Sequence, residues 1–221
     1  MPEVRARARP AALPLRNPVS SPCAAQSVKT RSPSGEKHRL REQLRAELQR
    51  LSAEQRAEAG AAVRSRLKRQ AVWAQARFVL FYAPFGEEID VWCLAQEALD
   101  NGKLVALPQF DRQQGSYRSC QVRDLHRDVA IGYSRIREPK PGCPVVPLNL
   151  LDLVLVPGVG FDRYGRRLGR GQGYYDRLLA DVRGTKCGLA FDCQWVTEIP
   201  AEPHDVRLDC IVTPSRWWVV A

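Results

Sequence analysis

Leucines recur every three or four residues from Leu40 to Leu51. This spacing places them on one face of a helix, because a helix completes a turn in about 3.6 residues. The next residues, Ser52-Ala53-Glu54-Gln55, form a capping-box sequence, in which the serine and the glutamine satisfy free N–H groups at a helix start. The pattern therefore predicts two consecutive helices, the second continuing to about Arg69.

Short apolar runs and helix-like segments alternate along the rest of the chain. We expect strands at 77–82, 103–107, 118–122, 153–156, 186–191 and 208–213. We expect helices at 91–101 and 173–182, and a loop at 137–147, which holds four prolines and one glycine. Strand–helix–strand alternation is typical of a parallel sheet with crossover helices. The predicted fold is α/β, a single three-layer, Rossmann-like domain with a mostly parallel sheet.

The 221 residues have a formal net charge of +10, and half of it lies in residues 1–35, where six bases accompany one acid. This segment is rich in proline, which excludes a continuous helix. We predict a disordered, basic, Pro-rich extension at 1–35, followed by one domain at 36–221. Organelle targeting and an over-extended start site are the alternatives for the extension. No run of 18 apolar residues occurs, so no membrane-spanning helix is predicted.

The positive charge has two explanations. Basic proteins often bind nucleic acid or another polyanion. An arginine-rich coding background explains the same bias, since 28 of the 34 bases are arginine. No RNA- or DNA-binding motif accompanies the charge, and we expect no nucleic-acid partner.

Seven cysteines are scattered along the chain without a C-x-x-C pair, and three histidines are equally dispersed. No zinc site can be assembled from this spacing. Cysteines inside apolar runs, such as Cys210, are expected to be buried as small apolar side chains. The pattern favours a reducing, intracellular location.

A glycine-rich segment after the predicted strand 153–156 holds the main candidate chemistry. Residues 157–176 read Pro-Gly-Val-Gly-Phe-Asp-Arg-Tyr-Gly-Arg-Arg-Leu-Gly-Arg-Gly-Gln-Gly-Tyr-Tyr-Asp. Open α/β sheets bind ligands at the carboxyl ends of their strands, and Arg166, Arg167 and Arg170 offer positive charge to a polyphosphate. A solvated basic loop is the alternative, because the segment has neither the G-x-x-x-x-G-K-[ST] pattern nor G-x-G-x-x-G after a first strand.

The complete string from Phe161 to Asp176 resembles the signature of the 5-formyltetrahydrofolate cyclo-ligase family, also called methenyltetrahydrofolate synthetases. The resemblance continues on both sides, from about Glu36 to Pro214. Its further motifs are Lys37-His38-x-Leu40-Arg41, Glu87-Glu88-Ile89-Asp90, Glu138-Pro139, Leu151-Asp152-Leu153 and Val206-Arg207-Leu208-Asp209.

This resemblance implies a cytoplasmic ligase that uses ATP and Mg²⁺. Its substrate would be 5-formyltetrahydrofolate, polyglutamylated forms included, and its products 5,10-methenyltetrahydrofolate, ADP and phosphate. In the implied reaction ATP phosphorylates the formyl oxygen, which is otherwise a poor leaving group, and the folate nitrogen at position 10 then closes the ring. The protein contributes mainly positioning and charge neutralisation. We expect a monomer.

The resemblance also implies roles for single positions. The implied catalytic residues are Arg167, Arg170 and Tyr174. The implied ATP-binding residues are Lys37, Arg41, Arg167, Leu168, Gly169, Arg170, Gly171, Gln172, Gly173, Tyr174 and Tyr175. The implied substrate-binding residues are Ala83, Glu88, Arg170, Gly171, Gln172, Gly173 and Tyr174. Asp176 and Asp209 correspond to magnesium ligands, and hard oxygen ligands suit that ion.

Several of these roles have plainer alternatives. Lys37 and Arg41 lie on the polar face of the predicted helix, where solvent could satisfy both. Asp176 could simply complement a helix dipole, and Glu87 is a rival to Glu88. Gln172 stands where some family members have a basic residue. Two other function classes are a nucleic-acid-binding protein and a family relative that binds ATP but acts on another substrate.

Overall fold

The computed structural model describes residues 33–221, so the predicted extension up to residue 32 lies outside the described residues. Helix α1 (Pro33–Gln49) begins inside the segment that we assigned to the extension. It is followed by α2 (Ala53–Lys68) and the short α3 (Ala71–Gln75). The predicted capping box is present, since Gln55 N donates to Ser52 Oγ and Ser52 N donates to Gln55 Oε1.

Seven strands form the central sheet in the order β12-β11-β9-β6-β1-β2-β3. Five of them are parallel: β1 (Phe78–Leu80), β2 (Leu104–Asp111), β6 (Leu153–Val156), β9 (Thr185–Leu189) and β11 (Cys210–Val212). The edge strands β3 (Ser116–Val122) and β12 (Trp217–Val219) are antiparallel to their neighbours. The prediction of a mostly parallel sheet is confirmed.

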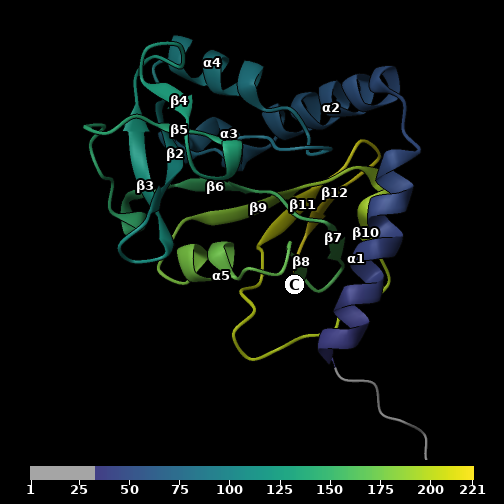
Figure 1. Ribbon diagram of the computed structural model, residues 1–221. Coiled ribbons are helices and arrows are strands. Elements are labelled where there is room, and N and C mark those ends of the chain that lie inside the picture. The colour runs from purple at the N-terminus through teal and green to yellow at the C-terminus, as the bar shows by residue number, and fades with distance from the viewer. Residues whose placement is uncertain (1–32) are drawn as a thin grey trace, which may run out of the picture. The chain divides into compact units, whose positions relative to one another are not determined.

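Helices cover both faces of this sheet (Figure 1). On one face α2, α3 and α4 (Trp92–Asp100) pack against strand residues such as Val79 and Leu155. On the other face α5 (Tyr174–Leu179) packs against their neighbours, such as Leu80 and Val154. Successive strand side chains point to opposite faces, so a strand covered on both sides is apolar throughout. The three-layer prediction is confirmed.

The glycine-rich segment is a β-hairpin and not an open loop. Its strands β7 (Gly160–Asp162) and β8 (Arg167–Leu168) are antiparallel, and β10 (Trp195–Val196) pairs with β7. Helix α1 packs on this small sheet through Leu44, which lies in one apolar cluster with Val159 and Leu168 of the segment. Figure 1 shows α1 beside β7 and β10. This packing holds α1 against the predicted site.

Segment 137–147 is only partly a loop. It begins with β5 (Arg137–Pro139), which pairs with β4 (Val129–Ile131), a strand that the sequence pattern did not indicate. The two-stranded sheet accepts Pro139 because each strand is an edge strand. The remaining short elements are 3₁₀ turns: η1 (Tyr133–Arg135), η2 (Leu148–Leu150) and η3 (Asp192–Gln194). In the part of the chain that the structure describes, no helix is both long and apolar enough to span a membrane.

Candidate active site

A cleft of about 420 Å³ lies at the carboxyl ends of β1 and β6, where Ala83, Pro157 and Gly158 line it. Helix α1, the end of the glycine-rich segment and the start of α5 contribute other walls. The cleft brings together every predicted site residue except Asp209. These lining residues are Lys37, Arg41, Ala83, Glu88, Arg167, Leu168, Gly169, Arg170, Gly171, Gln172, Gly173, Tyr174, Tyr175 and Asp176.

The β7–β8 hairpin is organised by a buried carboxylate. Asp162 Oδ1 accepts hydrogen bonds from the backbone N–H groups of Tyr164 and Arg166, and its Oδ2 accepts from Ile199 N at 2.8 Å. Gly165 turns the hairpin with φ of 75°. A Cβ at this glycine would lie 2.5 Å from the carbonyl oxygen of Leu208. These members of the signature therefore shape the hairpin and do not line the cleft.

Arg167 belongs to β8 in the glycine-rich segment and is 8% exposed. Its Nη2 lies 3.0 Å from both carboxylate oxygens of Asp176, and its Nη1 donates to Pro157 O at 3.4 Å. Its guanidinium also lies over the ring of Tyr175, at 5.6 Å from the centroid. A Cβ at Gly169 would be 2.7 Å from Arg167 Nη1. This glycine therefore leaves the space that the guanidinium occupies.

Arg41 reaches the same loop from α1, where its Nε donates to Gly169 O at 2.7 Å. Burial lowers the pKa of Arg41, and the charges of Arg45 and Arg167 lower it further. Two arginines are thus held in one cleft by loop carbonyls and one carboxylate. This arrangement suits an anionic ligand that neutralises both.

Lys37 is buried on α1. The alternative that solvent surrounds this side chain is therefore wrong. Its Nζ lies 2.7 Å from Glu202 Oε2 and 2.7 Å from Asp205 Oδ2. Burial alone would lower the pKa of Lys37, but the hydrogen bonds from Nζ to Asp205 and Glu202 raise it overall. Sequence reasoning missed both acids, because no local pattern links α1 to residues 202–205.

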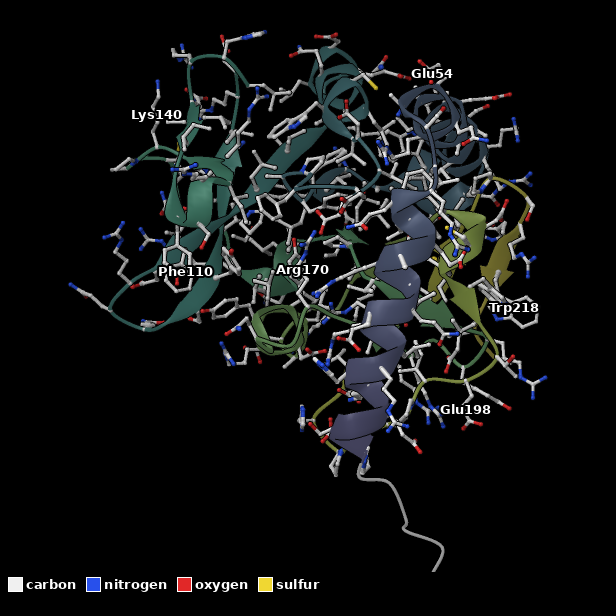
Figure 2. The ribbon with its side chains drawn as sticks, turned by 45° about the vertical axis from the view of Figure 1, so that its right-hand side comes forward. Glu54, Phe110, Lys140, Arg170, Glu198 and Trp218 are labelled. Atoms are coloured by element: carbon white, nitrogen blue, oxygen red, sulfur yellow. The ribbon has the colours of Figure 1, made fainter. Side chains whose placement is uncertain are left out.

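Glu88 and Arg170 bind each other across the cleft. Glu88 Oε1 accepts from Arg170 Nη2 at 2.9 Å, and Glu88 Oε2 accepts from Phe85 N at 3.0 Å. Burial raises the pKa of Glu88, and the charge of Arg170 opposes that rise. Glu87 does not line the cleft, so the structure favours Glu88 between the two acids. In the view of Figure 2, Arg170 lies between Phe110 and α1.

Aromatic side chains form the wall beside Tyr174. The Tyr174 ring lies edge-on to Phe110 at 5.4 Å and to Tyr117 at 5.5 Å, and Tyr133 stacks on Phe110 at 4.0 Å. Tyr117 and Tyr133 line the cleft, as does Glu138 of β5. Sequence reasoning assigned no role to these three residues. The motif Glu138-Pro139 was the one signal that pointed to this wall.

Asp209 lies at the amino end of β11, at the opposite edge of the sheet from the cleft. Its side chain is 53% exposed and is paired with Lys186 at 3.4 Å. The two-aspartate magnesium site does not fit this arrangement, so only Asp176 is kept as a candidate ligand. Among the described residues, one cluster of three possible metal-ligating side chains occurs, Glu202, His204 and Asp205. Lys37 already contacts the two acids of that cluster.

The fold and the cleft define an α/β protein with a cleft lined by lysine and arginine side chains at the carboxyl ends of its strands. The model of the 5-formyltetrahydrofolate cyclo-ligase family matches residues 33–214. The chain belongs to this family. It is therefore a cyclo-ligase, an enzyme of folate-dependent one-carbon metabolism that forms a carbon–nitrogen bond.

Individual relatives agree with the family assignment. The 5-formyltetrahydrofolate cyclo-ligase of Escherichia coli (strain K12) is 33% identical over 172 residues, which cover 76% of this chain and 94% of the relative. That of Mycolicibacterium smegmatis is 35% identical over 151 residues, which cover 63% and 75%. The solved structure of Aquifex aeolicus 5,10-methenyltetrahydrofolate synthetase is 32% identical, with a TM-score of 0.76, over 83% of this chain and 92% of that one.

Proposed function

We propose that this chain uses ATP to convert 5-formyltetrahydrofolate into 5,10-methenyltetrahydrofolate, with release of ADP and phosphate. The observation that carries the proposal is one cleft that contains four cations, Lys37, Arg41, Arg167 and Arg170, together with the carboxylate of Glu88. The cations suit a polyphosphate, and the carboxylate suits the N–H donors of a folate ring.

The chemistry needs the terminal phosphate of ATP next to the formyl oxygen. After phosphoryl transfer to that oxygen, N10 attacks the formyl carbon and phosphate leaves as the ring closes. Arg167, fixed by Asp176, neutralises charge on the transferring group. Arg41 holds the loop and the phosphates, while Arg170 and Tyr174 position the folate side. Arg170 must exchange its bond with Glu88 for a substrate contact when the folate binds.

Mg²⁺ would neutralise phosphate charge when bound with ATP, and Asp176 is the residue that would hold it. This ion is usually bound through one or two carboxylates together with substrate phosphates. Each oxygen of Asp176 accepts one hydrogen bond from Arg167. Since a carboxylate oxygen has two lone pairs, both oxygens keep capacity to accept a ligand bond.

A cyclisation assay tests the proposed function. The full chain mixed with 5-formyltetrahydrofolate, ATP and Mg²⁺ should produce the near-ultraviolet absorbance of the methenyl product, and omission of ATP should abolish it. Folded protein that binds ATP without forming this product would instead indicate a relative with another substrate.

The two aspartates give a matched pair of variants. Asp176→Asn is expected to shift the Mg²⁺ dependence of turnover at least tenfold toward higher concentration, because a charged ligand is replaced by a neutral one. Asp209→Asn should stay within twofold of the wild type, because this residue lies away from the cleft. A magnesium titration of initial rates measures both. An equal shift in the two variants would contradict the assignment.

We also propose that the enzyme is cytoplasmic and monomeric and that residues before α1 take no part in catalysis. A chain beginning at Pro33, where the described residues and α1 start, should have the kcat/KM of the full chain. Size-exclusion chromatography with light scattering should give the monomer mass for both chains. A several-fold loss of kcat/KM in the shortened chain would assign the extension a catalytic role.

A further inference from the structure

A second buried carboxylate lines the cleft. Glu138 lies in the middle of β5 and is 6% exposed. Its Oε2 accepts a long hydrogen bond of 3.3 Å from Phe110 N. Its Oε1 is buried and has no hydrogen-bond partner among the residues that the structure describes. One oxygen of this carboxylate is therefore left without a donor.

An unpaired buried acceptor lowers the stability of the folded protein, and a charged one lowers it more. Burial raises the pKa of Glu138, while the backbone N–H groups of Phe110 and Tyr133 and the charge of Arg112 oppose that rise. Protein groups thus offset only part of the cost of burying the charged form of Glu138. In a cleft, such a group is typical of a site whose missing partner comes with the ligand.

The turn before β5 holds Glu138 in this position. Ser134 and Arg135 have φ of 55° and 62°, in the left-handed region that non-glycine residues rarely adopt. Backbone strain of this kind persists where the surrounding structure enforces it, often at binding sites. A Cβ at Gly132 would lie 2.6 Å from Glu138 Oε2. Glycine at 132 therefore gives the carboxylate room to lie against the turn.

The surroundings of Glu138 indicate what kind of donor it would meet. Tyr117 and Tyr133 line the same cleft as Glu138. Burial raises the pKa of Tyr117 to about 12, and the negative charges of Glu138 and Glu88 contribute to this rise. The charges of both carboxylates therefore contribute to the raised pKa of one tyrosine in the cleft. Aromatic faces combined with acceptor oxygens suit a planar ring that carries N–H groups.

We propose that Glu138 is a second substrate-binding carboxylate, whose free oxygen accepts a hydrogen bond from an N–H group of the reduced folate. This role rests on the proposed function and adds a specificity-determining residue to it. Glu138 differs from Glu88, both of whose oxygens already have partners in Arg170 and Phe85. The folate can therefore bind Glu138 without first breaking an ion pair.

Substitution of Glu138 tests this role, with Ser119→Ala as the matched control. Ser119 Oγ is also buried without a partner among the described residues, but Ser119 does not line the cleft. Glu138→Ala should raise the Kd for 5-formyltetrahydrofolate, and its KM in the cyclisation assay, about ten- to hundredfold. Glu138→Gln should raise them about three- to tenfold, because an amide oxygen still accepts a neutral hydrogen bond. The KM for ATP should change less than twofold, and Ser119→Ala should match the wild type.

The melting temperature of the free protein separates binding from a structural role. Glu138→Gln should melt at or above the wild-type temperature, because a partly compensated buried charge is removed. A folate Kd within twofold of the wild type in Glu138→Ala would overturn the inference. So would an affinity loss in both variants accompanied by a lower melting temperature of the free protein. Absence of folate binding and turnover in the wild type would instead contradict the proposed function itself.

Discussion

Arg167→Ala is expected to lower kcat/KM for the cyclisation about a thousandfold. The guanidinium is buried in the cleft wall and fixed by Asp176, so its charge is already oriented before phosphate arrives. Removing one such preorganised donor commonly costs two to three orders of magnitude in rate, and arginines at transferring phosphoryl groups contribute similarly. Initial rates at varied ATP and folate concentrations measure the effect.

Two further arginine variants make this result specific. Arg167→Lys keeps the charge but loses the guanidinium donors to Asp176 and Pro157. Its kcat/KM should therefore lie between those of Arg167→Ala and the wild type. Arg163→Ala removes an exposed arginine of the same hairpin, which donates to Tyr164 Oη, and should stay within twofold of the wild type. If folded Arg167→Ala keeps more than a tenth of wild-type kcat/KM, the proposed role is wrong.

Lys37→Met is expected to lower the free energy of unfolding by about 2 kcal/mol near pH 7. Removal of one partner from a buried ion pair typically costs about 3–5 kcal/mol. The Glu202 side chain is 32% exposed, so solvent screens part of this effect. The variant leaves Glu202 and Asp205 close together without their cation. It should also raise the KM for ATP, because Lys37 lines the cleft.

The stability difference should depend on pH in a defined direction. The pKa of Lys37 is raised above 10.5, so its contribution is complete below that value and disappears as pH rises through the folded-state pKa. Burial would raise the pKa of Asp205, but the hydrogen bond from Lys37 lowers it below 3.8. That contribution is present above pH 3.8 and disappears as pH falls through the lowered pKa. The difference between wild type and variant should therefore be largest between about pH 4 and 10.

Urea unfolding across this pH range measures the effect, with Lys68→Met as the control. Lys68 forms an exposed pair with Glu97, and its replacement should cost less than about 0.5 kcal/mol at any pH. A double-mutant cycle with Asp205→Asn should give a coupling energy of about 1–2 kcal/mol. Equal stability losses for Lys37→Met and Lys68→Met would show that the buried ion pairs of Lys37 stabilise the fold no more than the exposed pair of Lys68 does.

Local patterns predicted the elements whose formation depends on neighbouring residues. The leucine stripe of α1, the capping box at Ser52 and the apolar strand Leu153–Val156 are all present. The pattern failed where proline count was taken as evidence of a loop, since β5 ends in Pro139. It also missed the β7–β8 hairpin, because its turn depends on Asp162 and Gly165 bonding to residues far along the chain.

The family, the mostly parallel α/β fold and about half of the residues that line the cleft could be predicted from the sequence alone. The reason is that the signature is one contiguous string next to a buried strand. Which charged side chains form pairs became visible in the folded structure. It paired Lys37 with Glu202 and Asp205, and Arg170 with Glu88, across separations of 82 to 168 residues. It also placed Asp209 at the far edge of the sheet and Glu138 in the cleft. The physical reason is that periodicity arises from the local geometry of the backbone, whereas charge pairing depends on which strand ends the sheet order brings together.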